Sequence, residues 1–383
     1  MLAGSGKKGF DEYLISSAAR ALRVLAESAG DPDGKHEFWP IWSFVVDAAA
    51  AASGPVQPHE NDPLTDSLNA PGGYLAEAFI FKLHQERSDG VFGDDLRKYL
   101  NALADGDHDF HFLARTMLAS RLPWLHAIDH EWVGDVLIAR MGFNGSELNS
   151  EARALWQGFL WAPRLNPKLL EDLKAAFLQA LSRDLNLRSD DNLFHLFADL
   201  LLKAPDKLSS DEIRNAFRDM PVDGLVACAR YWRQVLQGAS EGAANTWTEK
   251  IGPLIQEYWP AINTKVTRQT VEALALLIIQ TNEAFHRALE TVSEKNLLAP
   301  LAPSGFILRR LANVGTDRDS GNYYDYASNH PHETITLIDR SVDFDRLTFQ
   351  REDLRGILNR ARAADVSVEL TEEYIRLYQR SVF

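Results

Sequence analysis

The apolar positions between Asn149 and Leu181 recur with the spacing of two consecutive amphipathic helices. In the first of them the apolar residues are three or four positions apart and share one helical face: Ala152, Leu155, Trp156, Phe159 and Leu160. Pro163 marks the end of this helix. Asn166 followed by Pro167 is typical of a helix start, because the asparagine can cap free amides and the proline ring suits the first turn. The segment therefore predicts an antiparallel helix hairpin.

The same periodicity continues on both sides of this hairpin. Further helices are expected over residues 11–28, 38–52, 74–87, 94–104, 108–120, 123–141, 190–203, 209–218, 221–237, 243–259, 264–292 and 371–380. The 264–292 stretch is expected to break near Thr281 and Asn282. Each hairpin leaves apolar surface that only further hairpins can cover. The sequence therefore predicts an all-α fold of stacked antiparallel helix hairpins, a helical-repeat (α-solenoid-like) architecture.

The first predicted helix shows which of its faces should be buried. The expected apolar side consists of Leu14, Ala18, Ala21, Leu22 and Leu25.

After the second helix comes an irregular stretch, residues 53–73, with four prolines and three glycines. Loops of this length are usually functional or linkers, and a solvated connection is the preferred interpretation. We accordingly divide the chain into an N-terminal helical segment, residues 1–70, and a helical-repeat-like domain, residues 71–383.

Composition and charge narrow the functional classes. The 383 residues are 45% hydrophobic and 25% charged, which is typical of a folded, soluble protein. The single cysteine, Cys228, cannot form an internal disulfide, which suits a reducing cytoplasm, and it is expected to be a small buried side chain. The longest strongly apolar run, Leu274 to Ile279, is much shorter than the roughly 20 residues that a bilayer requires. We expect a cytoplasmic protein that does not cross a membrane.

The net charge of −14 argues against nucleic acid as the main partner, because such binding depends on lysines and arginines at phosphates. The basic residues that could still bind nucleic acid are Arg309, Arg310 and the arginines from Arg351 to Arg362. Acidic residues between and beside them cancel much of this positive field: Asp343, Asp345, Glu352 and Asp353. Nucleic-acid binding is therefore the disfavoured hypothesis.

Four histidines between residues 105 and 131 are the candidate metal ligands. His108 and His111 are three positions apart, so they can share a helix face and bind a divalent metal. The same holds for His126 and His130, which are four positions apart. Histidine and aspartate are also common at helix ends, and no known zinc or di-iron spacing is reproduced. A metal-dependent hydrolase is the alternative function, while the preferred interpretation assigns no cofactor and no catalytic residue.

Aromatic residues offer two candidate contact surfaces. Tyr323, Tyr324 and Tyr326 lie in a polar stretch, residues 313–331, where they could contact a partner, or pack the loop against neighbouring helices, which we favour. The nine tryptophans lie on or beside the apolar helix faces. They either fill gaps between stacked hairpins or line a binding groove, and the sequence leaves both interpretations open.

Two runs of this sequence resemble the helical C-terminal regions of bacterial antiphage defence proteins: ALWQGFLWAPRLNPKLLEDLKAAFLQAL and NHPHETITLIDRSVDF. In those proteins such regions follow a sirtuin-type NAD-hydrolysing domain or a STAND-type nucleotide-binding domain. The resemblance extends from Trp132 to the C-terminus, and it implies a sensing, scaffolding or autoinhibitory role with catalysis in an effector domain outside this chain. Neither the sirtuin-type pocket nor a STAND P-loop is found here, so no catalytic residue is transferred. The sequence predicts a non-enzymatic module that recognises a protein partner or regulates an attached effector.

Overall fold

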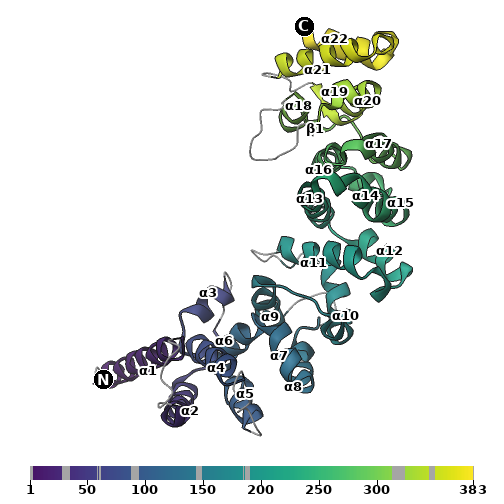
Figure 1. The fold of residues 1–383 in the computed structure, drawn as a ribbon. Helices are drawn as coiled ribbons and strands as arrows, with labels where there is room; N and C mark the ends of the chain where they lie inside the picture. Colours follow the sequence, from purple (N-terminus) through teal and green to yellow (C-terminus); the bar gives the residue numbers. More distant parts are fainter. Residues whose placement is uncertain are drawn as a thin grey trace. The chain divides into compact units, whose positions relative to one another are not determined.

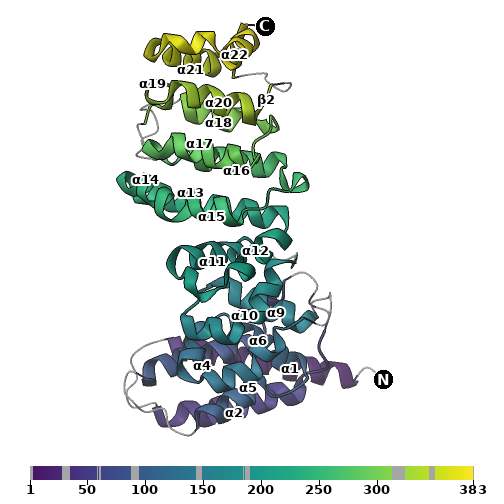
Figure 2. The ribbon, with the colours of Figure 1, turned by 90° about the vertical axis from the view of Figure 1, so that its right-hand side faces the viewer.

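The computed structural model describes residues 3–27, 35–57, 59, 62–87, 95–143, 149–183, 185, 190–312, 324–344 and 350–382. In these residues the secondary structure is almost entirely helical (Figure 1, Figure 2). The strands that the structure describes are the two-residue β1 (Ala302–Pro303) and β2 (Val342–Asp343), which pair in parallel. The prediction of an all-α fold built from stacked helix hairpins is confirmed.

The chain forms two compact units. The first comprises Met1–Ala180 and Asp184–Leu193, and the second comprises Leu181–Arg183 and Phe194–Phe383. The boundary predicted after residue 70 lies inside the first unit. The boundary close to residues 181–194 was not predicted, because the helical periodicity on its two sides is the same.

The first unit is arranged around one helix, α6, that is buried on all sides. Its helices are α1 (Ala3–Glu27), α2 (Lys35–Ala52), α3 (Pro63–Leu68), α4 (Pro71–Arg87), α5 (Leu96–Ala104), α6 (Asp109–Ala119), α7 (Leu122–Ile128), α8 (His130–Val136), η1 (Ile138–Arg140), α9 (Ser150–Trp161) and α10 (Pro167–Leu181). Every residue of α6 from Phe110 to Ala119 is buried. Helices α3, α4, α5 and α9 pack against it and cover it from several sides, so α6 forms the centre of the core.

The predicted hairpin of residues 149–181 is present as α9 and α10. The Asn149 side chain accepts a hydrogen bond from the amide of Ala152 at 2.7 Å and so caps α9. Asn166 caps α10 in the same way through the amide of Leu169, at 2.9 Å. The predicted apolar face of α9 is buried in full.

Helix α1 turns a different face to the core from the one predicted. Leu22 is buried as expected, but Leu14 and Leu25 are 49% and 60% exposed. Ala19 and Ala26 are buried instead, on the side where α1 packs along α4. Apolar residues occupy more than one side of this helix, so its periodicity does not select the buried face, and the neighbouring helix does.

The second unit consists of helices in two layers. It contains α11 (Asp190–Lys203) from Phe194 onward, η2 (Pro205–Lys207), α12 (Ser210–Asp219), α13 (Val222–Ala239), η3 (Ser240–Gly242), α14 (Ala243–Thr246), the π-helical η4 (Trp247–Ile251), α15 (Gly252–Tyr258), η5 (Asn263–Lys265), α16 (Arg268–Ile279), η6 (Asn282–Ala284), α17 (Phe285–Glu294), α18 (Ser304–Ala312), α19 (Tyr326–Asn329), α20 (Pro331–Ser341), α21 (Arg351–Ala364), η8 (Val366–Leu370) and α22 (Glu372–Val382). Helices α13, α16, α18 and α21 follow one another in one layer, and α12, α15, α17, α20 and α22 in the other (Figure 1). Each pair covers the apolar face of the next.

The predicted break in the helix over residues 264–292 is also present. Helix α16 ends at Ile279, and Asn282 adopts a left-handed conformation with φ of 52° before α17 begins at Phe285. Asparagine tolerates this conformation better than most residues, because its short side chain can bond locally. The break turns one apolar stretch into two helices, one in each layer.

A close approach of α9 to α6 generates a stability prediction. A Cβ added at Gly158 would lie 2.2 Å from the carbonyl oxygen of Thr116, so Gly158→Ala must push the two helices apart. We expect it to lower the free energy of unfolding by about 1–3 kcal/mol, measured by urea denaturation. Gly134→Ala in α8 is the matched control, because its added methyl meets nothing within 4 Å. That change should stabilise by about 0.5–1 kcal/mol, and equal effects at both positions would contradict the packing argument.

Candidate functional site

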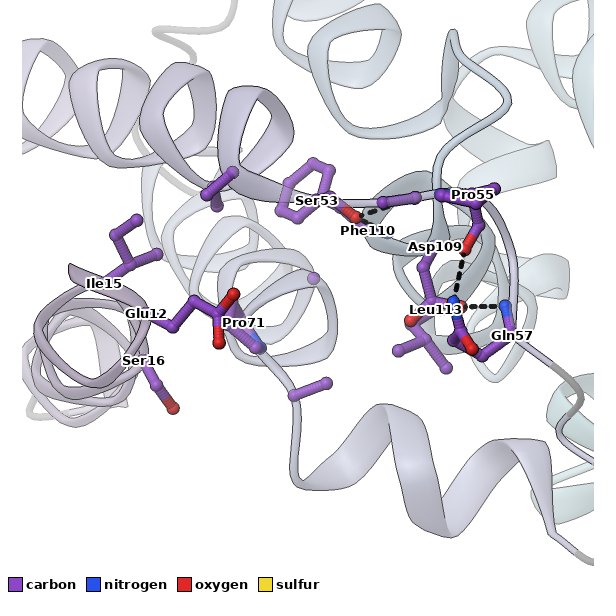
Figure 3. A pocket seen from close by; sticks show the side chains of 15 residues that line it. Glu12, Ile15, Ser16, Ser53, Pro55, Gln57, Pro71, Asp109, Phe110 and Leu113 are labelled. Atoms are coloured by element: carbon purple, nitrogen blue, oxygen red, sulfur yellow. Dashed lines mark hydrogen bonds between the residues drawn. The ribbon is translucent and has the colours of Figure 1, made fainter. Parts of the chain in front are cut away.

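A pocket with a volume of about 490 Å³ lies in the first unit, where the ends of several helices meet (Figure 3). Its walls are α1, the end of α2, the residues that follow α2, and the starts of α4 and α6. Glu12 and Ile15 of α1 lie across the pocket from Pro55 and Gln57 in Figure 3. Most of the lining is apolar, including Ile15, Ala49, Ala52, Pro71, Phe110 and Leu113. Pockets of this size and character bind small molecules or side chains of other proteins.

The wall formed by residues 53–57 is held along the start of α6. The amide of Asp109 donates to the carbonyl of Gly54 at 3.0 Å, and the amide of Phe110 donates to the Ser53 hydroxyl at 2.9 Å. The Asp109 carboxylate in turn accepts from the amide of Gln57 at 2.9 Å. The stretch over residues 53–73, predicted as an irregular solvated connection, is exposed at residues 54–57, but its start is fixed and lines the pocket. The prediction is wrong for residues 63–68, which form helix α3, and for residues 71–73, which begin α4.

The start of α4 can form another wall because it carries two glycines. A Cβ at Gly72 would lie 2.3 Å from the carbonyl oxygen of Phe110, and one at Gly73 would lie 1.7 Å from that of Ser67. Any larger residue would force α4 away from α3 and α6. These glycines therefore determine how closely the pocket walls approach one another.

His59 forms an ionic bridge between Asp66 of α3 and Asp109 at the start of α6, and Asp109 lines the pocket. Its Nδ1 lies 2.8 Å from Oδ2 of Asp66, its Nε2 lies 2.8 Å from Oδ1 of Asp109, and its ring stacks on Phe112 at 5.1 Å. Burial acts to lower the pKa of His59, but the hydrogen bonds and negative charges of Asp109 and Asp66 outweigh it and raise the pKa above the usual value. Carboxylates only accept hydrogen bonds, so the ring is held as a doubly protonated cation. This arrangement positions the loop; it leaves neither nitrogen for proton transfer to a substrate.

The structure brings the four candidate metal ligands together in pairs. His108 is the N-cap residue of α6 and its ring lies 6.0 Å from that of His111, while the rings of His126 in α7 and His130 in α8 are 6.2 Å apart. His126 Nε2 is hydrogen-bonded to Asp172 Oδ2 at 2.7 Å. Burial lowers the pKa of His111, and the charges of Arg115 and His108 lower it further. Within the described ranges no group of three or more His, Cys, Asp or Glu side chains is arranged to hold a metal ion.

The candidate tyrosines take part in packing where the structure describes them. Tyr323 lies outside the described residues. Tyr326 is only 4% exposed, and its hydroxyl donates to the carbonyl of Ile279 and to the Asn282 side chain. Tyr324 is half-buried and hydrogen-bonds His330 at 2.8 Å. These contacts correspond to the packing interpretation, and partner binding by the tyrosines stays a prediction.

Cys228 has the environment expected for a structural residue. It is fully buried in α13, and burial raises the pKa of its thiol far above the usual value. Its Sγ lies 3.6 Å from the carbonyl oxygen of Phe194. A thiol in this state is a poor nucleophile, because the reactive thiolate is suppressed.

The sequence matches no family model, and no curated protein matches it either. Among the helices that the structure describes, none combines the length and the apolar character needed to span a bilayer. The functional argument therefore depends on the geometry of this chain.

The bridge at His59 predicts a defined pH dependence of stability. Its pKa in the folded state is raised above the ordinary value of 6.5. Its stabilising contribution is therefore complete below about pH 6.5 and is lost as the pH rises through the folded-state value. His59→Gln should lower the free energy of unfolding more at about pH 5.5 than at about pH 8.5, measured by urea denaturation at both values.

The control for this experiment is His84→Gln, which changes an exposed histidine of the same unit. An exposed side chain of this kind should alter stability little at either pH. A larger destabilisation of His59→Gln at the alkaline than at the acidic pH would contradict the ionic bridge.

Proposed function

We propose that this chain is a non-catalytic recognition module, in which stacked helix hairpins form a scaffold and the pocket of the first unit binds a segment of a partner protein. The pocket is the observation that carries this proposal. Its mostly apolar lining favours an apolar side chain as the ligand, since burial of such a group contributes about 25 cal/mol per Å² of surface.

The charges at the pocket define the partner further. Glu12 lines the pocket and forms no hydrogen bond or ion pair with any residue that the structure describes. Asp109 also lines it, and its Oδ1 is already occupied by His59 and Gln57. A partner segment with a lysine or arginine beside its apolar side chain would complement Glu12 and gain specificity from that pairing.

The resemblance to helical regions of bacterial antiphage defence proteins supports a regulatory setting for this recognition. On that basis the proposal extends to a cytoplasmic sensing, scaffolding or autoinhibitory module whose partner is an effector domain outside this chain. The ionisable groups around the pocket are consistent with this role, because His59 and its two carboxylates stabilise the wall rather than face a substrate.

Selection from a displayed library of random peptides tests the pocket directly. We expect enriched peptides to combine a large apolar residue with a neighbouring lysine or arginine. Ala52→Phe, which fills the pocket from the end of α2, should weaken their binding by roughly tenfold or more in a fluorescence anisotropy titration. Glu12→Lys should weaken it as well, because it reverses the charge at the pocket.

Two matched variants separate the pocket from its surroundings. Ala51→Phe adds the same ring at the adjacent exposed position, and Glu27→Lys makes the same charge change at the other end of α1. Neither residue lines the pocket, so both variants should bind like the unaltered protein. The proposal is wrong if no peptide is enriched, or if Ala51→Phe and Ala52→Phe reduce binding equally.

A further inference from the structure

Helix α22, at the outer end of the second unit, carries an apolar face that the rest of the unit leaves uncovered (Figure 1). Ile375, Tyr378 and Val382 are between 46% and 48% exposed, and their spacing of three and four positions places them on one side of the helix. The buried residues Tyr374 and Leu377 are on the side where α20 and α21 pack. The outermost helices of a stacked array usually have a polar outer side, so an apolar one indicates a partner. We call Ile375, Tyr378 and Val382 the end face.

A cation lies at one end of this face. The guanidinium of Arg355, on α21, donates to the carbonyl oxygen of Ser381, the residue before Val382, at 2.8 Å. A backbone carbonyl is neutral, so this bond positions the guanidinium without cancelling its charge. Arg351 precedes Arg355 by four positions, so both arginines lie on one side of α21, and both are exposed. A ligand on the end face therefore meets positive charge beside Val382.

The same layer of helices shows how an apolar helix face is covered in this protein. Where one helix of the layer packs on another, a basic and an acidic side chain often meet across the contact. Three such pairs, with the distance between their charged atoms, are Arg214 of α12 with Glu257 of α15 at 3.9 Å, His286 of α17 with Glu333 of α20 at 2.7 Å, and Asp339 of α20 with Arg376 of α22 at 2.8 Å. Apolar contact and one pair of opposite charges thus occur together.

We propose that the end face binds an amphipathic helix of a partner protein, whose apolar side covers Ile375, Tyr378 and Val382 and whose carboxylate pairs with Arg355. The partner helix takes on the outer side of α22 the role that α20, with Asp339, has on another side. A carboxylate suits Arg355 because a guanidinium can donate two parallel N–H groups to it. The site lies in the second unit and is independent of the pocket in the first.

Other occupants fit the end face less well. Glu352 and Asp353 follow Arg351 and weaken the field that a long polyanion requires, whereas a single carboxylate needs only the nearest guanidinium. The net charge of −14 likewise disfavours an anionic membrane surface. Three half-exposed side chains are too few for a stable dimer of this chain, which takes about 800 Å² per partner.

Selection from a displayed library of amphipathic helices tests the end face on the complete chain. The library carries leucine, isoleucine or phenylalanine at the apolar positions and glutamate, glutamine or lysine at the flanking ones. We expect the enriched helices to carry glutamate. Ile375→Glu should weaken the binding of a synthetic enriched helix by roughly tenfold or more in a fluorescence anisotropy titration, and Tyr378→Glu provides a second variant with the same expected loss. Arg355→Glu should change the selection from glutamate to lysine, which a purely structural role of Arg355 would not do.

Ile262→Glu is the matched control, because it makes the same change at an exposed isoleucine between α15 and η5 and should bind like the unaltered protein. Ala52→Phe, in the pocket of the first unit, should also leave this binding unchanged, so the two sites are tested separately. The proposal is overturned if no helix is enriched, if the two isoleucine variants lose binding equally, or if Arg355→Glu still selects glutamate. Dimerisation in light scattering, or binding to phosphatidylserine vesicles, that Ile375→Glu abolishes would assign the face to a second copy or to a membrane instead.

Discussion

Burial of apolar helix faces between successive hairpins is the constraint on which the rest of this structure depends. No hairpin can cover its own outer face, so each one is stable only through its neighbours. The tryptophans show how the remaining gaps are filled. Trp42, Trp156 and Trp232 are fully buried, and each donates its indole N–H to a backbone carbonyl: that of Leu75, Met141 and Ala198 at 3.0, 3.0 and 3.3 Å. A large ring then contributes apolar area without leaving its one polar group unsatisfied.

Close packing of this kind also explains how the first unit forms a pocket. Glycines at 72, 73 and 158 let helix backbones approach where a side chain would not fit. The irregular residues after α2 cannot pack in this way, and they are held instead by hydrogen bonds to the start of α6 and by the bridge through His59. The buried Arg115 has a similar role, since it donates to the carbonyls of Ala104 and Gly106 and pairs with Glu151. Ionisable groups here stabilise irregular backbone.

The two units offer different chemistry for recognition. In the first, the charged side chains beside the pocket are mostly satisfied internally, and the apolar lining is what a ligand can use. In the second, Arg355, Arg360 and Arg362 have partners within the chain.

The sequence alone determined much of the local structure of this protein, although helices α3, α18, α20 and α21 were not predicted. The periodicity of apolar residues, the caps Asn149 and Asn166 and the break at Asn282 depend on neighbouring residues, so the hairpins could be predicted from them. Only the tertiary structure decided which side of α1 is buried, because several of its faces are apolar. The same holds for the unit boundary and for the bridge from His59 to Asp109 across 50 residues. These features arise from contacts between distant segments, which the spacing of residues along the chain does not specify.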